Sequence, residues 1–93
     1  MKFLNLKLIF EMFLAKIKIT LRKSILDPQG KAVEHAIGTM NVGSVHEVRI
    51  GRYIELKVDA AEEGAARTIT EDVCKKLLAN PVMEDFHFEL IKI

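Results

Sequence analysis

The feature that most constrains the fold is a regular alternation of apolar and polar residues over residues 13–22. Phe13 and Ile17 fall on one side of an extended chain, while Lys16 and Lys18 fall on the other. A period of two is that of a β-strand with one buried and one solvated face. The rest of the chain must therefore supply apolar residues that cover one face of this strand.

A helix start follows the strand at Asp27 and Pro28. The Asp side chain can accept hydrogen bonds from free backbone N–H groups of a first helical turn, and Pro suits the first helical position. Apolar residues then recur at intervals of three and four, which predicts a helix to about Asn41. Two interpretations stay open for the polar corner formed with Gln29 and Gly30: a packing corner or a docking point.

Two short alternating runs follow, over residues 45–50 and 53–58. They flank Gly51 and predict either an antiparallel hairpin or one ribbon bent at a Gly bulge. In the second run Ile54 and Leu56 share one face with Val58, and these residues are predicted to face the core.

A second helix is predicted from a cap at Asp59, which stands at capping-box spacing from Glu62, to about Ala79. The Asn80-Pro81 pair predicts its end, because Pro cannot continue a helix. Its apolar stripe is predicted to consist of Ala66, Ile69, Val73, Leu77 and Leu78. Residues 86–93 alternate again and predict a last strand.

The order strand, helix, strand, strand, helix, strand is typical of a two-layer α+β fold of ferredoxin-like type, βαββαβ. It predicts a four-stranded, mainly antiparallel sheet with strand order 4-1-3-2 and both helices on one face. Charged residues on the open face are expected to pair across strands. Ile91 and Ile93 are apolar on that face and suggest that another subunit covers part of it.

Composition indicates one small folded domain, because 93 residues with 49% hydrophobic content suffice for one core and not two. A net charge of +1 favours neither nucleic acid nor an anionic membrane as a partner. Tyr53 is the only aromatic residue expected on the open sheet face, which argues against base stacking with RNA. The single cysteine, Cys74, excludes an internal disulfide and fits a reducing compartment such as the cytoplasm.

Residues 1–11 are predicted to be an N-terminal extension, either an extra strand or the product of a start codon placed too early. A single domain is then expected over residues 12–93. Asn5 and Lys7 interrupt the apolar run, and no clear signal-peptide cleavage site follows. The run is also shorter than the roughly 18 apolar residues of a membrane span.

No group of residues has the spacing of a catalytic or metal site. Cys74 has no His or basic residue within one turn on its N-terminal side and is predicted to be a small buried or half-buried apolar residue. His35, His46 and His87 lie on different predicted elements and lack metal-ligand spacing. The acidic pair that begins at Glu84 is predicted to lie in a solvated turn.

Three blocks of the chain, residues 26–36, 45–56 and 76–86, together resemble the PurS family, the small subunits of phosphoribosylformylglycinamidine synthase. The blocks occur in the order and at the spacing of that family. The resemblance covers about residues 12–90 and leaves out the predicted extension.

This resemblance implies a non-catalytic subunit of a complex in purine biosynthesis that amidates formylglycinamide ribonucleotide. In such a complex a glutaminase subunit (PurQ) releases ammonia and a large synthetase subunit (PurL) uses it, while the small subunit bridges the two and forms dimers or tetramers. The resemblance further implies that ATP, Mg²⁺ and glutamine are used by the partner subunits. This chain is then expected to bind no cofactor, metal, nucleic acid or membrane.

The residues expected to contact partners come from the first two blocks: Asp27, Gln29, Gly30, Arg49, Arg52 and Tyr53. Capping of the helix is a competing explanation for Asp27. Arg52 is the strongest candidate, because it is charged, lies at a predicted turn and is not needed for the core. The alternative function is a stand-alone sensor of small molecules, similar to ACT domains, which share the ferredoxin-like shape.

Overall fold

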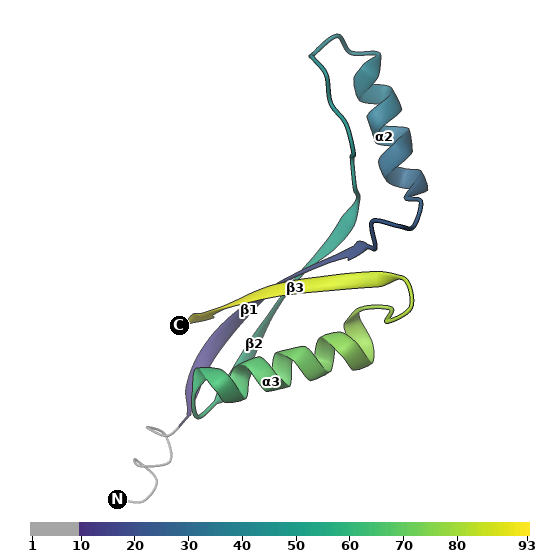
Figure 1. The fold of residues 1–93 in the computed structure, drawn as a ribbon. Coiled ribbons are helices and arrows are strands. Elements are labelled where there is room, and N and C mark those ends of the chain that lie inside the picture. The colour runs from purple at the N-terminus through teal and green to yellow at the C-terminus, as the bar shows by residue number, and fades with distance from the viewer. Residues whose placement is uncertain (1–9) are drawn as a thin grey trace, which may run out of the picture.

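The computed structural model describes residues 10–93, which form a three-stranded antiparallel sheet, a helix packed on it and an arm that projects away from it (Figure 1). The strands are β1 (Glu11–Leu21), β2 (Gly51–Ala60) and β3 (Glu84–Lys92). Their order is β2-β1-β3, so β1 pairs with a neighbour on both sides. The predicted strand over residues 13–22 is therefore confirmed as the centre of the sheet.

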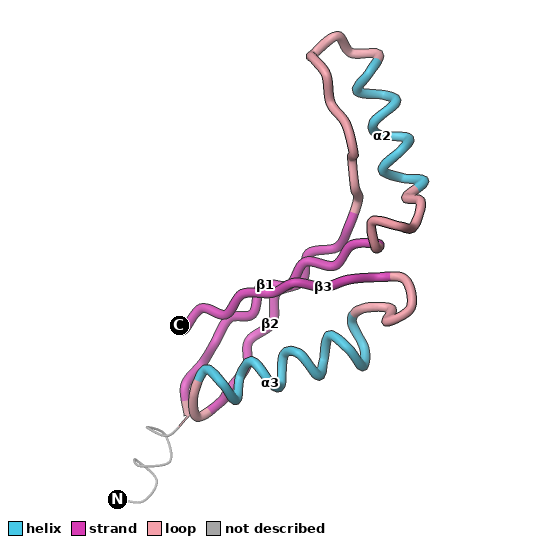
Figure 2. The backbone as a smooth tube through the Cα atoms, in the orientation of Figure 1, coloured by secondary structure: helices cyan, strands magenta, loops and turns pink. Residues whose placement is uncertain are grey.

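The helical elements are α2 (Pro28–Gly38), α3 (Glu63–Val73) and the π-helical turn η1 (Cys74–Leu78) that continues α3. The π turn closes where the N–H of Ala79 donates to the carbonyl of Cys74 at 2.9 Å. Figure 2 shows α3 running along one face of the sheet, whereas α2 lies beyond the end of the strands. None of the helices within residues 10–93 has the length and apolar character needed to cross a membrane.

The core lies between α3 and one face of the sheet. Its buried residues alternate along β1 and are joined by residues of β2, α3, η1 and the segment after η1: Phe13, Ala15, Ile17, Ile19, Val58, Ala60, Ala66, Cys74 and Ala79. Thr70 is also fully buried, because its hydroxyl donates to the carbonyl of Ala66 at 2.8 Å. The predicted helix stripe is partly wrong, since Ile69 and Leu77 are 43% and 78% exposed.

The predicted four-stranded ferredoxin-like sheet is wrong. Residues 45–50 form no strand, and α2 does not cover the sheet, so only α3 lies on the apolar face. In this segment the backbone N–H groups of Val48 and Ile50 donate to the side chains of Glu34 and Asp27, respectively, and not to a neighbouring strand. Glu47 has a φ of 56°, which interrupts the extended conformation that a hairpin strand requires. The three strands that do form keep their predicted relative order.

The start of the second helix also differs from its prediction. Asp59 does not cap the helix but lies within β2, opposite Met12 of β1. The helix begins at Glu63, and its N-cap residue Glu62 makes no side-chain capping bond. The predicted stop is confirmed, because Ala79 is already extended.

Residues 27–50 are called the arm. They include α2 and, after it, the stretch of chain that leads back to β2, which is called the returning segment. Within the arm only Asp27 and Gly30 are buried. The described chain measures 66 × 29 × 14 Å and has a radius of gyration of 18.6 Å. A compact domain of this length would have a radius of about 12 Å. The arm therefore extends from the domain without a core of its own.

Residues 1–9, the greater part of the predicted extension, lie outside the described residues. Glu11, the last residue of that extension, is the first residue of β1.

Candidate functional site: the junction of sheet and arm

Asp27 closes the base of the arm. Its Oδ1 accepts a hydrogen bond from the N–H of Gly30 at 2.9 Å, and its Oδ2 accepts one from the N–H of Ile50 at 2.8 Å. The side chain thus caps α2 and also ties the helix to the returning segment. These two N–H donors, aided by the positive charge of Arg49, hold the pKa of Asp27 below its usual value. The predicted capping role is present, and a second bond is added to it.

Gly30 allows α2 to lie close to the returning segment. A Cβ atom at this position would overlap the carbonyl oxygen of Val48 and would come within 2.9 Å of Oδ2 of Asp27. Beyond this contact, Oε1 of Glu34 accepts a hydrogen bond from the N–H of Val48 at 3.2 Å. The two halves of the arm are therefore held together along the first two turns of α2.

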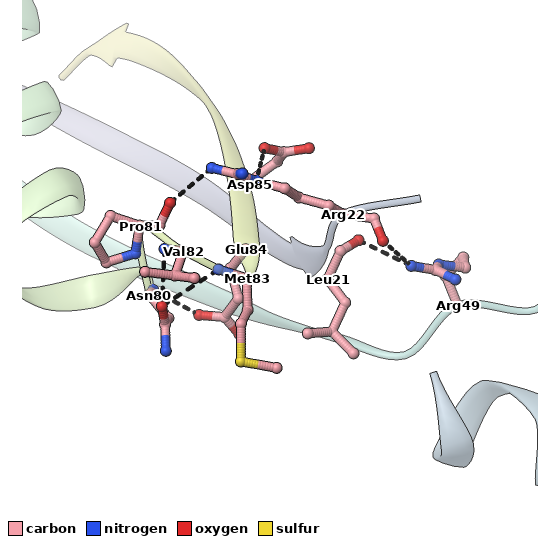
Figure 3. Close-up of polar contacts among 9 residues, drawn as sticks. All are labelled: Leu21, Arg22, Arg49, Asn80, Pro81, Val82, Met83, Glu84 and Asp85. Atoms are coloured by element: carbon pink, nitrogen blue, oxygen red, sulfur yellow. Dashed lines mark hydrogen bonds and ion pairs between the residues drawn. The ribbon is translucent and has the colours of Figure 1, made fainter. Parts of the chain in front are cut away.

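Arg49 lies on the returning segment and binds the outgoing one. Its Nη2 donates to the carbonyls of Leu21, Arg22 and Ile25 at 3.0, 2.8 and 3.2 Å. Figure 3 shows the first two of these bonds. A single guanidinium group therefore joins the two segments of chain that connect the arm to the sheet.

Arg22, whose carbonyl binds Arg49, also contacts the loop before β3. Its Nη2 donates to the carbonyl of Pro81 at 2.6 Å, and its Nε lies 3.3 Å from Oδ1 of Asp85 (Figure 3). Its own backbone N–H donates to the carbonyl of Met83 at 2.9 Å. The end of β1, the arm and the loop before β3 therefore meet around Arg22.

Arg52 makes a bidentate ion pair with Glu84. Its Nη1 and Nη2 donate to the two carboxylate oxygens at 2.9 and 2.8 Å, and Nη2 also donates to the carbonyl of Leu78 at 2.9 Å. Glu84 Oε1 in turn accepts from the N–H of Asn80 at 2.8 Å. The paired hydrogen bonds raise the pKa of Arg52 and, together with the Asn80 bond, lower the pKa of Glu84. The Glu84 side chain is only 13% exposed and that of Asp85 is 68% exposed, so the prediction that this acidic pair is solvated is wrong for Glu84. Both residues lie at the start of β3 and not in a turn.

A cleft of about 610 Å³ opens between the base of the arm and the connection from β1. Three basic and three acidic side chains line it: Lys23, Lys31, Arg49, Asp27, Glu34 and Glu47. Its balanced charge favours neither an anionic nor a cationic small ligand. Leu26, which also lines the cleft, is 66% exposed.

Tyr53 lies elsewhere, on the sheet face that α3 does not cover. There Lys16 stands opposite Glu55 and Glu89 in the strand register, as the predicted cross-strand charge pairing requires. The hydroxyl of Tyr53 donates to Oε2 of Glu55 at 2.6 Å, which raises the pKa of Tyr53 to about 12. Ile91 is 39% exposed on the same face, opposite Leu14.

The prediction that Cys74 is a small buried residue is confirmed. Cys74 is fully buried, and burial, together with the charge of Glu71, raises the pKa of its thiol. Among residues 10–93, no cluster of three His, Cys, Asp or Glu side chains is placed to hold a metal ion.

Comparison with known proteins assigns the chain to a family. The family model PurS, described as phosphoribosylformylglycinamidine (FGAM) synthase, matches residues 14–92. The chain belongs to the PurS family. The PurS subunit of Bacillus subtilis strain 168 is 39% identical over 82 residues, which cover 88% of this chain and 96% of that protein. This chain is therefore a PurS subunit of FGAM synthase, in purine biosynthesis, as its three sequence blocks indicated.

Solved PurS structures share the architecture described above. The crystal structure of Methanocaldococcus jannaschii PurS superimposes with a TM-score of 0.77 at 32% identity, covering 87% of this chain and 98% of that one. The structure of PurLQS from Thermotoga maritima contains a chain that matches with a TM-score of 0.77 at 29% identity, covering 88% of this chain and 98% of that one.

Three of the six predicted contact residues, Asp27, Gly30 and Arg49, lie together where the arm joins the sheet of this PurS chain. Gln29 is exposed on the first turn of α2, next to them, whereas Arg52 lies farther along β2 and Tyr53 lies on the open face. No sequence pattern reveals the roles of Arg22, Glu34 and Glu84, because each binds a residue or backbone group that is distant in the chain.

Proposed function

We propose that the chain is a non-catalytic subunit that associates with itself and bridges the glutaminase and synthetase subunits of FGAM synthase. The observation that supports this proposal is the exposed apolar surface of the arm. The arm extends away from the sheet and carries apolar side chains that the chain itself does not cover: Val33, Met40, Val42 and Val45 are 39%, 62%, 63% and 43% exposed. Exposed apolar surface of this kind marks a contact surface for another protein.

Self-association as a dimer or tetramer would bury this surface. A second copy of the chain offers an identical arm, and most soluble homo-oligomers use such matched surfaces. Ile37 lies on the apolar side of α2 and is half-buried, whereas His35 lies on another side of the same helix and is exposed. Ile37→Asp should therefore shift the sedimentation coefficient to that of the monomer, and His35→Asp, which places the same charge on the same helix, should leave it unchanged.

A bridging subunit would support ammonia transfer without touching substrate. Ammonia released by a glutaminase is lost to water unless the receiving site is held close, so fixed geometry between the two partners raises the rate of amidation. The mixed charges and apolar groups of the cleft beside the arm suit such protein contacts. In this proposal ATP, Mg²⁺ and glutamine bind only to the partner subunits, and the complex works in the cytoplasm, where Cys74 stays reduced.

The decisive experiment combines co-purification with activity. The chain, the synthetase and the glutaminase are purified separately and mixed with ATP, Mg²⁺, glutamine and formylglycinamide ribonucleotide. The proposal expects co-elution of the three subunits and glutamine-dependent amidation only when this chain is present, while free ammonia supports the reaction without it. Full glutamine-dependent activity in the absence of the chain would refute the proposal.

A further inference from the structure

The arm is connected to the sheet at two places, through the outgoing residues 22–26 and through the returning residues 49–51. Backbone connections alone allow such an arm to swing, because α2 has no core contacts that set its angle to the sheet. The structure contains one side chain that joins the two connections. Arg49, on the returning side, donates to the carbonyls of Leu21, Arg22 and Ile25 on the outgoing side at 3.0, 2.8 and 3.2 Å.

We propose that Arg49 is a positioning residue for assembly: by binding these three carbonyl oxygens it fixes the angle between the arm and the sheet, so that α2 meets a second copy in one orientation. The proposal rests on the proposed function in one respect, since it takes self-association through the arm as the step that is favoured. The angle itself is a property of the single chain and is measured without any partner.

The contacts of Arg49 indicate that it orients the arm and contributes little to the stability of the core. Arg49 is half-buried; its bond to the carbonyl of Arg22 is exposed, and its bonds to those of Leu21 and Ile25 are partly buried. Water can replace the guanidinium at these carbonyls when it is removed, so that the sheet loses little. No buried residue of the sheet or of α3 is among the partners of its guanidinium. The side chain therefore acts mainly on the relation between arm and sheet.

The carbonyl of Arg22 is one of the three acceptors, and the side chain of Arg22 binds Pro81 and Asp85 (Figure 3). Arg49 thus binds the end of β1, and the side chain of Arg22 in turn binds this end of β1 to the loop before β3. Arg49 therefore anchors the arm to a fixed part of the molecule, and not to another mobile segment.

The distribution of arm angles sets the affinity of the chain for a second copy. When only a fraction of molecules holds the binding-competent orientation, the apparent dissociation constant rises as the inverse of that fraction. If loss of Arg49 leaves about one molecule in ten with the right orientation, self-association weakens about tenfold. Lysine is a poorer substitute, because its ammonium group is more strongly hydrated than a guanidinium and is carried on a more flexible stem.

The test measures the arm angle by single-molecule fluorescence transfer, at concentrations at which the full chain is monomeric. Dyes are attached at Thr39→Cys, at the far end of α2, and at Asp72→Cys, on the exposed side of α3; the buried Cys74 stays out of reach of the dyes. The unaltered arginine should give one narrow distance distribution. Arg49→Ala and Arg49→Lys should broaden it and weaken self-association about tenfold, with the circular dichroism of the sheet unchanged.

The matched control is Arg67→Ala, which removes a guanidinium from α3 that pairs with Glu63 and lies over the ring of Phe88, far from the arm. It should leave the distance distribution narrow. A narrow distribution in Arg49→Ala, a broad one in the unaltered chain, or weaker association without broadening would each overturn the proposal. If Arg49→Ala does not fold, Arg49→Lys decides by the same measurement. A chain that never self-associates would refute the proposed function but would leave the angle measurement valid.

Discussion

The close approach of α2 to the returning segment makes Gly30 the most informative position for substitution. In an isolated helix, replacing Gly by Ala stabilises the helix by up to about 1 kcal/mol. At Gly30 the new methyl group would overlap the carbonyl oxygen of Val48 and press on Oδ2 of Asp27. Overpacking of this kind costs about 1–3 kcal/mol, so the net effect of Gly30→Ala should be destabilising by up to about 2 kcal/mol.

Gly38 provides the matched control within the same helix. A Cβ atom there would meet no other atom within 4 Å, so Gly38→Ala should gain only the helix propensity. The propensity gain is similar for both substitutions and cancels in their difference. The difference between the two variants is then the steric cost at Gly30 alone, about 1–3 kcal/mol.

Thermal unfolding and amide hydrogen exchange measure this difference. For a domain of this size, 1 kcal/mol corresponds to roughly 4–8 °C in the midpoint of unfolding. Exchange in α2 locates the effect, because local opening of the arm need not reach the sheet. We expect faster exchange in α2 for Gly30→Ala and slower exchange for Gly38→Ala. If Gly30→Ala stabilises the arm as much as Gly38→Ala does, the close contact with Val48 is refuted.

Three further predictions concern the charged groups. Arg52→Ala should weaken co-purification with the synthetase subunit, as the sequence predicted, but it should also lower the midpoint of unfolding because Glu84 loses its partner; Arg67→Ala is the control, and equal binding by both variants would contradict the prediction. The lowered pKa of Glu84 contributes stability above its ordinary value of 4.5 that is lost as the pH falls through the lowered value, so Glu84→Gln should flatten the stability profile in that acidic range, and an unchanged profile would argue against the ion pair. Tyr53 is the only tyrosine and should titrate near pH 12 by ultraviolet absorbance, and Glu55→Gln should bring this value back toward 10; a titration near 10 in the unaltered chain would exclude the hydrogen bond.

Local patterns in the sequence were sufficient for the three strands that form and for the start of the arm helix. The alternation around Ile17 predicts β1 because burial on one face of a strand imposes a period of two. Asp27 and Pro28 predict the start of α2 because they act on the adjacent turn, and the capping bond to Gly30 is present. Asn41 has the positive φ, 55°, that the prediction assigned to the helix end, but α2 already ends at Gly38, three residues before Asn41.

The errors arose where distant groups replace local partners. The segment 45–50 has the alternation of a strand, but its N–H groups at Val48 and Ile50 bind Glu34 and Asp27, which lie 14 and 23 residues away. No local pattern reports such bonds. Thr70 is a separate case, because its hydroxyl bonds to the carbonyl of Ala66 in its own helix. Thr70 is thus buried with its polar group satisfied, whereas Ile69 is 43% exposed.

The candidate site could be predicted only in part for the same reason. Arg49 and Arg52 are recognisable as charged residues near a glycine, which makes them contact candidates. Their observed bonds are intramolecular and reach Leu21, 28 residues away, and Glu84, 32 residues away. Charge and position in the sequence therefore mark these two residues as candidates, whereas their hydrogen bonds depend on the fold.

The arm without a core also has a consequence for protein turnover. Segments with few buried contacts open readily and are the preferred sites of cleavage by proteases. A newly made copy that has not yet found its partners exposes α2 and the returning segment, whereas an assembled copy would have them covered. Surplus copies should then be degraded faster than assembled ones, so that the cell keeps this subunit in proportion to the rest of the enzyme without a dedicated control of its synthesis.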